Sequence, residues 1–400
     1  MKRVIDTENI PVKMWLENVE PNCMEQIKNL ANLPFAYKHV AIMPDSHMGY
    51  GMPIGGVLAT QGVVIPNAVG VDIGCGMCAV QTSLKEISTE QIKKIFGGSK
   101  EHKGGIRSAV PVGFSHHSKK QDEIFMPNID VRTCYTTKDD YPIIHQEYTS
   151  ALKQIGTLGG GNHFIEIQKG SDGYIWLMIH SGSRNLGYKV AKHYNNVAKA
   201  LNEKWYTSVP IKTELAFLPM DTKEYHNYMR EMNYCLEFAL ANRQLMMSRI
   251  KEIVKSVTAC TFESEINIHH NYATLEHHFG KNVMVHRKGA TSAKEGELGI
   301  IPGSQGTKSY IVKGKGNTDS FTSCSHGAGR KMGRKQAQRE LNLEEEQKKL
   351  EAQGILHSIR GVKQLDEASG AYKDIQVVMA NQSDLVEILV ELTPLGVIKG

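Results

Sequence analysis

Residues 322–330 place a histidine between small polar side chains and a glycine-rich turn, in the order Thr-Ser-Cys-Ser-His-Gly-Ala-Gly-Arg. Glycine adopts positive φ and has no Cβ, so such a turn lets backbone approach a phosphate closely. A neutral imidazole is a competent nucleophile toward phosphorus, and its pKa near neutrality lets it leave again. His326, followed closely by Arg330, is therefore the candidate catalytic nucleophile. A glycine-rich turn around a buried, structural histidine is the alternative, and this stretch alone leaves it open.

A second loop, residues 69–78, carries a carboxylate and a thiol in the order Val-Gly-Val-Asp-Ile-Gly-Cys-Gly-Met-Cys. Asp72 and Cys75 are separated by glycine and could direct both groups at one metal ion. Cys75 and Cys78 also fit a zinc or redox motif. However, a structural zinc site usually has a second such pair, which the chain lacks, and the glycines disfavour the helix that a thioredoxin-like motif opens. We predict metal ligation by Asp72 and Cys75 and a packing role for Cys78.

Three more histidines follow apolar or glycine-rich runs. His163 begins a predicted strand, whose alternation places it on the opposite face from Asn162. His180 ends the next predicted strand just before Ser-Gly-Ser-Arg, and His270 stands beside Asn271. Two strands that each present a histidine at a glycine-rich end favour one shared site. An amide next to a metal ligand could also hold a phosphate oxygen.

Other segments are less specific. Asp45 and His47 lie in a glycine-rich loop, and we interpret them as a turn-stabilising carboxylate and a surface histidine. Residues 301–310 offer hydroxyls and backbone N–H groups to a nucleotide but lack the order of a Walker A loop. Residues 97–150 are polar and charged, with little that indicates chemistry, so we expect a peripheral segment.

Composition sets outer limits on the function. The 400 residues are 40% hydrophobic and 22% charged, as in an ordinary soluble globular protein. A net charge of +5 permits an anionic substrate without the strongly basic stripe that would indicate one. The longest apolar run, 385–398, is interrupted by Glu387, Glu391 and Pro394, and no signal-peptide core is present. Seven scattered cysteines do not suggest a disulfide framework. We therefore expect a cytoplasmic, reduced protein.

The candidate loops are far apart in sequence, so one site requires one fold that gathers them. We predict a single large α+β domain over residues 1–400, with layered β-sheets packed against helices. Apolar spacing predicts helices near Met24–Leu33 and over Thr89–Phe96, Leu186–Leu201 and Thr222–Val257. The methionines and tyrosines of the last helix are expected to pack rather than bind a cofactor. A charged helix is expected over roughly 330–353, with the run Glu344–Glu346 on a solvated face.

Taken together, these motifs resemble the RtcB family of RNA-splicing ligases. The matching features occur in the family's order from Pro44 to Gly400. They are Asp-x-x-Cys, Gly-Asn-His-Phe-x-Glu, His-Ser-Gly-Ser-Arg, His-Asn, His-Arg-Lys-Gly-Ala, Pro-Gly-Ser-x-Gly-Thr, Ser-His-Gly-Ala-Gly-Arg and a terminal Lys-Gly. The resemblance implies joining of RNA that ends in a 2′,3′-cyclic phosphate or 3′-phosphate to RNA with a 5′-hydroxyl, using GTP and manganese. It does not identify the physiological RNA, the oligomeric state or an activating protein.

The resemblance also assigns roles to residues. His326 becomes the nucleophile that carries GMP. Two divalent ions are held by Asp72, Cys75, His163, His180 and His270, with the Cys75 thiolate as a bridge. By affinity alone this set favours zinc, so manganese follows from the resemblance. The implied GMP contacts are Asn162, Glu166, His270, Asn271, Pro302, Gly303, Ser304, Gln305, Ser309, His326, Gly327, Ala328, Gly329 and Lys399. Candidates for RNA phosphates are Arg184, Lys288 and Arg334.

Two other classes stay open on the residues alone. A dinuclear metal phosphoesterase could use the same ligands without a nucleotide. A non-catalytic RNA-end-binding protein could share the fold, although it would be free to lose both His326 and the metal ligands.

Overall fold

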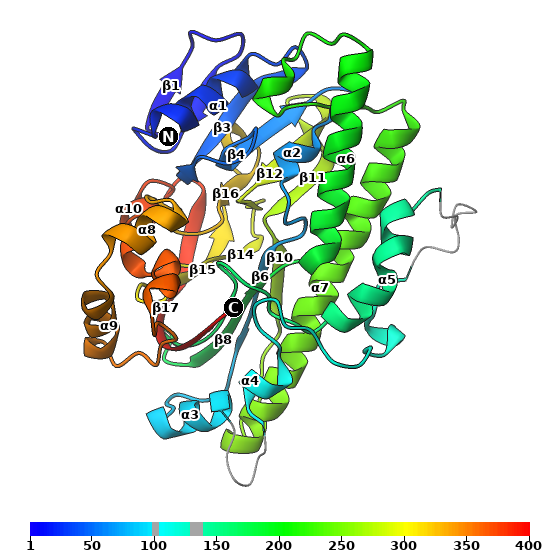
Figure 1. The fold of residues 1–400 in the computed structure, drawn as a ribbon. Helices are drawn as coiled ribbons and strands as arrows, with labels where there is room; N and C mark the ends of the chain where they lie inside the picture. Colours follow the sequence, from blue (N-terminus) through cyan, green and yellow to red (C-terminus); the bar gives the residue numbers. More distant parts are fainter. Residues whose placement is uncertain (98–103, 129–138) are drawn as a thin grey trace.

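Two large β-sheets form the centre of the computed structural model, which describes residues 1–97, 104–128 and 139–400 (Figure 1). The first sheet has the strand order β1-β2-β3-β4-β12-β11, and only β2 and β3 run parallel. Its strands are β1 (Arg3–Ile5), β2 (Val12–Met14), β3 (Ala36–His47), β4 (Ile54–Thr60), β11 (Asn271–His278) and β12 (Lys281–Lys288).

The second sheet is antiparallel throughout, with the order β10-β6-β8-β7-β17-β15-β14. Its strands are β6 (Gly76–Gln81), β7 (Phe164–Gly170), β8 (Ile175–Ser181), β10 (Ile266–His269), β14 (Leu298–Ile301), β15 (Ser309–Gly314) and β17 (Val386–Lys399). Every residue of β8 is buried, since neighbouring elements cover both faces of this strand. Two short pairs complete the strands: β5 (Val63–Val64) with β9 (Leu218–Pro219), and β13 (Ala290–Ser292) with β16 (Ser323–Ser325).

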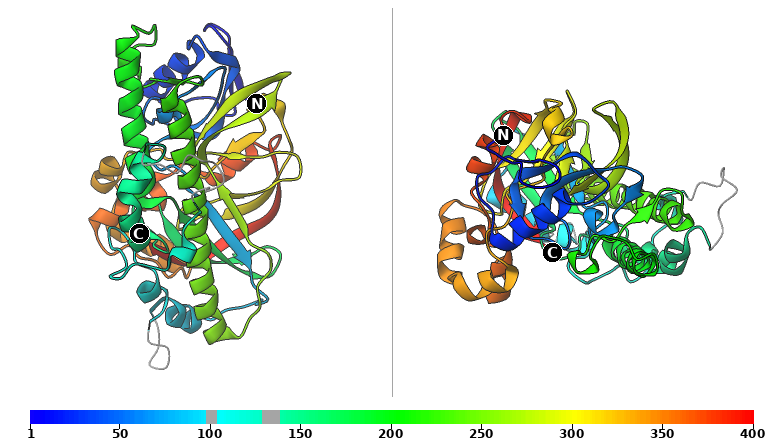
Figure 2. Two further views of the ribbon diagram at one scale, coloured as in Figure 1. Left: turned by 90° about the vertical axis from the view of Figure 1, so that its right-hand side faces the viewer. Right: turned by 90° about the horizontal axis from the view of Figure 1, so that it is seen from above.

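Helices lie on both flanks of the sheets, and Figure 2 shows the long pair α6 and α7 along one flank with α8 and α9 on the other. The described α-helices are α1 (Pro21–Ala31), α2 (Pro66–Val69), α3 (Thr89–Gly97), α4 (Ile106–Ala109), α5 (Pro142–Gln154), α6 (Arg184–Lys204), α7 (Lys223–Thr258), α8 (Arg334–Glu340), α9 (Leu343–Ala352) and α10 (Ile375–Ala380). The expected α+β domain of layered sheets and helices is confirmed. Within the described ranges, no helix combines the length and the apolar content needed to cross a membrane.

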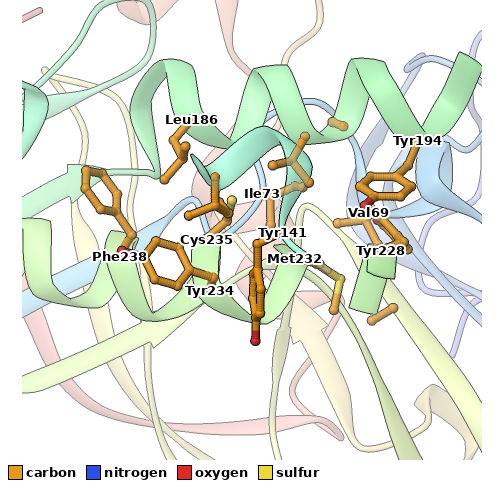
Figure 3. Close-up of a cluster of buried hydrophobic side chains, with 14 of the residues drawn as sticks. Val69, Ile73, Tyr141, Leu186, Tyr194, Tyr228, Met232, Tyr234, Cys235 and Phe238 are labelled. Atoms are coloured by element: carbon orange, nitrogen blue, oxygen red, sulfur yellow. The ribbon is translucent and has the colours of Figure 1, made fainter. Parts of the chain in front are cut away.

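The long helix α7 positions much of the core. Thr222 caps its first turn by accepting a hydrogen bond from the Tyr225 amide at 3.2 Å, and Ala259 ends the helix in the left-handed conformation. Tyr228 and Met232 are fully buried in a cluster of apolar side chains that also contains Leu186 and Tyr194 of α6 (Figure 3), so the predicted packing role of this stripe is confirmed. Burial of side chains of this size contributes about 1.5–3 kcal/mol each.

Two expectations are wrong in detail. The charged helix predicted over 330–353 is two helices, because the Asn342 side chain accepts hydrogen bonds from the Glu344 and Glu345 amides and starts α9 anew. Within the acidic run, Glu346 is buried rather than solvated and accepts a hydrogen bond from the Gly370 amide at 3.3 Å.

The segment 97–150 is not wholly peripheral. From Pro142 it enters α5, which buries Ile144 in the cluster shared with α6 and α7. Residues 98–103 and 129–138 of the chain, which the same prediction covers, lie outside the described residues.

Candidate metal and nucleotide site

His326 follows β16 and lies beside Asp45 of β3. The Nδ1 atom of His326 is 2.6 Å from Asp45 Oδ2, and the same carboxylate oxygen accepts a hydrogen bond from the His326 amide at 3.2 Å. A carboxylate only accepts, so Nδ1 carries the proton and Nε2 keeps its lone pair. Asp45 is fully buried within β3, and our interpretation of Asp45 as a turn residue is therefore wrong. The carboxylate instead orients the imidazole through its Nδ1 proton.

The glycine turn after His326 brings the two segments into contact. Gly329 has φ = +72°, and a Cβ at this position would collide with the Asp45 carbonyl. The turn therefore needs glycine, both for its backbone conformation and for the close approach of β3.

Five side chains from four separate segments converge next to His326. Cys75 Sγ lies 3.4 Å from His163 Nε2 and 3.2 Å from His180 Nε2, and the Nε2 atoms of His180 and His270 are 3.3 Å apart. Asp72 Oδ2 is 3.1 Å from His163 Nε2. The donor atoms of Cys75, His180 and His270 all lie within 4.8 Å of one another, as do those of Asp72, Cys75 and His163. Cys75 belongs to both groups, which is the arrangement of a ligand shared by two ions.

The tautomers of His163 and His180 are those that bind a metal ion through Nε2. His163 donates its Nδ1 proton to the Leu158 carbonyl at 3.0 Å, and His180 donates its own to the Asn162 carbonyl at 3.2 Å. Their Nε2 atoms therefore present lone pairs to Asp72 and Cys75. At Asp72 an acceptor faces an acceptor unless a cation lies between them. This donor set of three imidazoles, one thiol and one carboxylate suits divalent metal ions.

Burial explains the charge states of the ligands. It lowers the pKa of His180 and of His270 well below the ordinary value, with help from neighbouring imidazoles, so both rings are neutral and able to bind metal. Burial and the Asp72 charge raise the pKa of the Cys75 thiol well above its usual range. A thiolate at Cys75 therefore requires a cation nearby.

Arg243 of α7 fixes the loops that carry these ligands. Its buried guanidinium donates to the Gly74 and Ser181 carbonyls, each at 2.9 Å, and to Asn267 Oδ1 at 2.7 Å. Arg243 thus holds in place the residue before Cys75 and the residue after His180. Cys78 points elsewhere: it is fully buried in a hydrophobic cluster, as predicted for a packing residue.

A cavity of about 130 Å³ opens beside His326. Its cationic groups surround one buried carboxylate, Glu367, which pairs with Arg330 at 3.1 Å, Lys399 at 3.3 Å and Arg334 at 3.5 Å. Three cations against one anion leave a net positive lining that suits a phosphate or a carboxylate. The remaining lining residues are His47, Ile54, Asn162, Phe164, His180, Pro302, Gly303, Ser304, Gln305, Gly327, Ala328, Gly329 and Tyr372.

A larger cleft of about 850 Å³ shares His326, Asn162, Arg334 and Lys399 with this cavity. The cleft reaches the metal-ligand cluster at Asp72, Cys75, His163 and His270, and it extends outward past residues 113–114 and 358–367. Asn271 also lines it; its amide donates to the Asp72 carbonyl at 3.0 Å, and its Oδ1 accepts from the Gly289 amide at 2.7 Å.

Two of the residues expected to contact GMP lie outside both linings. Glu166 and Ser309 are buried and are joined through Gln168, whose amide donates to Glu166 Oε2 at 2.7 Å and to Ser309 Oγ at 3.2 Å. Burial raises the pKa of Glu166 to about 8, opposed by the nearby charge of Lys399. Both residues are thus placed to support neighbouring groups.

The three candidates for RNA contacts differ in availability. Arg334 is exposed and lines both cavities. Arg184 is half-buried with φ = +57°, and its Nε donates to Thr157 Oγ1 at 3.3 Å. Lys288 lines the cleft but is buried, and its ammonium already donates to the Tyr50 and Asn67 carbonyls. Lys288 therefore joins the loop at Tyr50 to α2, and Arg334 is the most exposed of the three candidates.

Sequence reasoning missed Asp45 and Glu367 as site residues. The only sequence signal for Asp45 was its position two residues before His47. His47 is half-buried and lines the smaller cavity, so it is not the surface histidine that we expected. Glu367 has no local motif, since its importance comes from three cations supplied by other segments.

A nucleophile-type histidine next to a two-metal donor cluster and a cationic cavity is typical of enzymes that transfer phosphoryl or nucleotidyl groups. The chain belongs to the RtcB family: the family model described as tRNA-splicing ligase RtcB matches residues 26–400. It is 39% identical to the RNA-splicing ligase RtcB of Escherichia coli (strain K12), with 99% of each chain covered. It is also 33% identical to the tRNA-splicing ligase RtcB of Methanococcus maripaludis, with 99% of this chain and 96% of the relative covered.

Proposed function

We propose that this protein is a GTP- and manganese-dependent RNA ligase. It joins RNA that ends in a 3′-phosphate, or in a 2′,3′-cyclic phosphate, to RNA with a 5′-hydroxyl. Family membership and the names of the relatives support RNA ligation. The single observation that carries the mechanism is the His326–Asp45 pair, which leaves Nε2 unprotonated beside the donor cluster and the cationic cavity.

In the first step, His326 Nε2 attacks the α-phosphorus of GTP. A P–N bond forms, the bond from the α-phosphorus to the bridging oxygen breaks, and pyrophosphate leaves. The ring becomes cationic as Nε2 bonds to phosphorus, and the Asp45 carboxylate, 2.6 Å from Nδ1, stabilises that charge.

In the later steps, a 3′-phosphate oxygen of RNA takes GMP from the histidine, which breaks the P–N bond. The 5′-hydroxyl then attacks the activated 3′-phosphorus and releases GMP, leaving a phosphodiester. A cyclic end first needs hydrolysis by water, because the transfer requires a free 3′-phosphate oxygen.

The metal ligands are proposed to be Asp72, Cys75, His163, His180 and His270. Manganese ions bound there would neutralise phosphate charge and act as Lewis acids. The chain's own cations, Arg330, Arg334 and Lys399, supply further positive charge at the nucleotide, and Glu367 holds them together.

A sealing assay tests this function. The wild-type protein is incubated with GTP, Mn²⁺ and two RNA strands. One strand ends in a 3′-phosphate, and the other is labelled and begins with a 5′-hydroxyl. We expect a joined product that disappears when either GTP or Mn²⁺ is left out.

The same assay distinguishes the two other classes. Release of inorganic phosphate from the 3′ end without GTP would instead indicate a dinuclear phosphoesterase. Tight binding of RNA ends without joining or phosphate release would indicate a non-catalytic end-binding protein.

A further inference from the structure

Phe114 is an apolar side chain that is fully exposed to solvent. Its relative exposure is 102%, and none of the large hydrophobic residues that the structure describes is more exposed. The ring does not stand on an outer surface far from the site, because Phe114 lines the large cleft that leads to His326 and the metal ligands. Exposure of a phenyl ring to water is unfavourable by about as much as its burial is favourable.

The backbone around Phe114 is fastened to the catalytic centre. Val112 forms a bridge with Gly159, the Gly113 amide donates to the Gly159 carbonyl at 2.8 Å, and the Leu158 amide donates to the Pro111 carbonyl at 2.9 Å. Leu158 in turn accepts the Nδ1 proton of His163 at 3.0 Å. The ring is therefore presented at a set place relative to the metal ligands.

The space beside the ring is open. Gly113, Gly160 and Gly161 line the cleft next to Phe114. A Cβ at Gly113 would meet nothing within 4 Å, and one at Gly160 would meet only the Gly113 Cα, at 3.6 Å. A Cβ at Gly161 would lie 3.0 Å from Arg334 Nη2, so the side chain of this cation borders the same glycines.

Charges along the cleft select the ligand. Its cationic lining residues are Lys288, Arg334, Lys363 and Lys399, of which Arg334 and Lys363 are exposed. Its carboxylates are Glu367, which pairs with Arg330, Arg334 and Lys399, Asp72, which belongs to the metal-ligand cluster, and the half-buried Asp366. An aromatic ring and several cations that line one cleft are typical of a single-stranded nucleic-acid channel, where bases stack and phosphates pair with charge.

We propose that Phe114 stacks on a nucleobase of an RNA strand in this cleft, close to the end that is joined. This inference rests on the proposed function, since it names a subsite for the RNA substrate. Stacking of this kind changes affinity by about 5- to 150-fold when the ring is removed. Phe114 acts in binding and takes no part in the attack of His326 on GTP.

The test measures the affinity of the full-length protein for a 3′-phosphate single-stranded RNA without GTP. Phe114→Ala should weaken binding about 5- to 150-fold, whereas Phe114→Trp should retain it and show tryptophan quenching when RNA binds. Tyr206→Ala is the matched control, because Tyr206 is 94% exposed on the turn after α6 and is not part of the cleft lining. This control should bind RNA as the wild type does.

RNAs with one abasic nucleotide at successive positions from either end locate the stacked base. For the wild-type protein, an abasic nucleotide at one position should weaken RNA binding as much as Phe114→Ala does. For the Phe114→Ala protein, an abasic nucleotide at that same position should cause no further loss of affinity. Unchanged RNA affinity in Phe114→Ala, an equal loss in Tyr206→Ala, or additive losses at every abasic position would overturn the inference.

Guanylylation of His326 is followed in parallel, so that the two proposals fail separately. Phe114→Ala should take up GMP label at the wild-type level. A wild-type protein without label would contradict the proposed function, while the RNA affinities would still decide whether Phe114 stacks.

Discussion

His326→Ala should abolish covalent labelling by GTP while leaving the protein folded. The imidazole supplies the nitrogen of the P–N bond, and loss of a nucleophile costs at least about 10⁴-fold in rate. The fold should survive because His326 is at the end of a short strand and five other residues form the metal-ligand cluster. Labelling with [α-³²P]GTP and Mn²⁺ after denaturation measures the loss, and thermal unfolding monitors the fold.

The variant should also fail to seal 3′-phosphate RNA with GTP, yet partly recover when RNA carrying a preformed 3′-guanylate is supplied. That recovery is expected because displacement of GMP by the 5′-hydroxyl does not need the histidine as a nucleophile. His277→Ala is the matched control, since His277 is exposed on β11 and lies outside both cavity linings. GMP label on the His326→Ala protein would show that His326 is not the nucleophile.

Cys75→Ala should remove bound manganese and, with it, guanylylation. Its sulfur belongs to both donor groups, so one substitution takes a ligand from each ion. Loss of an outer partner of a metal ligand already weakens binding about 10- to 100-fold, and loss of a shared ligand should exceed this. Metal content after dialysis, measured by inductively coupled plasma mass spectrometry, gives the stoichiometry.

Cys78→Ala provides the control three residues away. Cys78 is fully buried in an apolar cluster, so its loss should cost about 1 kcal/mol of stability and leave manganese in place. Equal loss of manganese from both variants would revive the interpretation of Cys75 and Cys78 as one motif.

The convergence of the candidate metal ligands could be predicted because each of these residues has a local context. His163 and His180 flank buried strands that pair with each other, so their neighbouring ends had to meet at one edge of the sheet. Asp72 and Cys75 share one loop, and β6, which begins at Gly76, pairs with β8. Here short-range patterns and strand pairing point to the same place.

The rest depends on contacts that no local pattern contains. Asp45 meets His326 across 281 positions of sequence, through the packing of β16 against β3. Asn342 divides a charged segment because its side chain caps a new helix more favourably than it continues the old one. Lys288 was a candidate for an RNA phosphate, but its buried ammonium donates to the carbonyls of Tyr50 and of Asn67 in α2. Burial lowers the pKa of Lys288 to about 7.

Intact-mass spectrometry of the wild-type protein after incubation with GTP and Mn²⁺ decides whether His326 carries GMP. We expect a mass increase of one GMP that survives denaturation, is lost in mild acid as expected for a P–N bond, and maps to the peptide containing His326. No adduct with GTP and Mn²⁺ present, or an acid-stable adduct on a different residue, would contradict it.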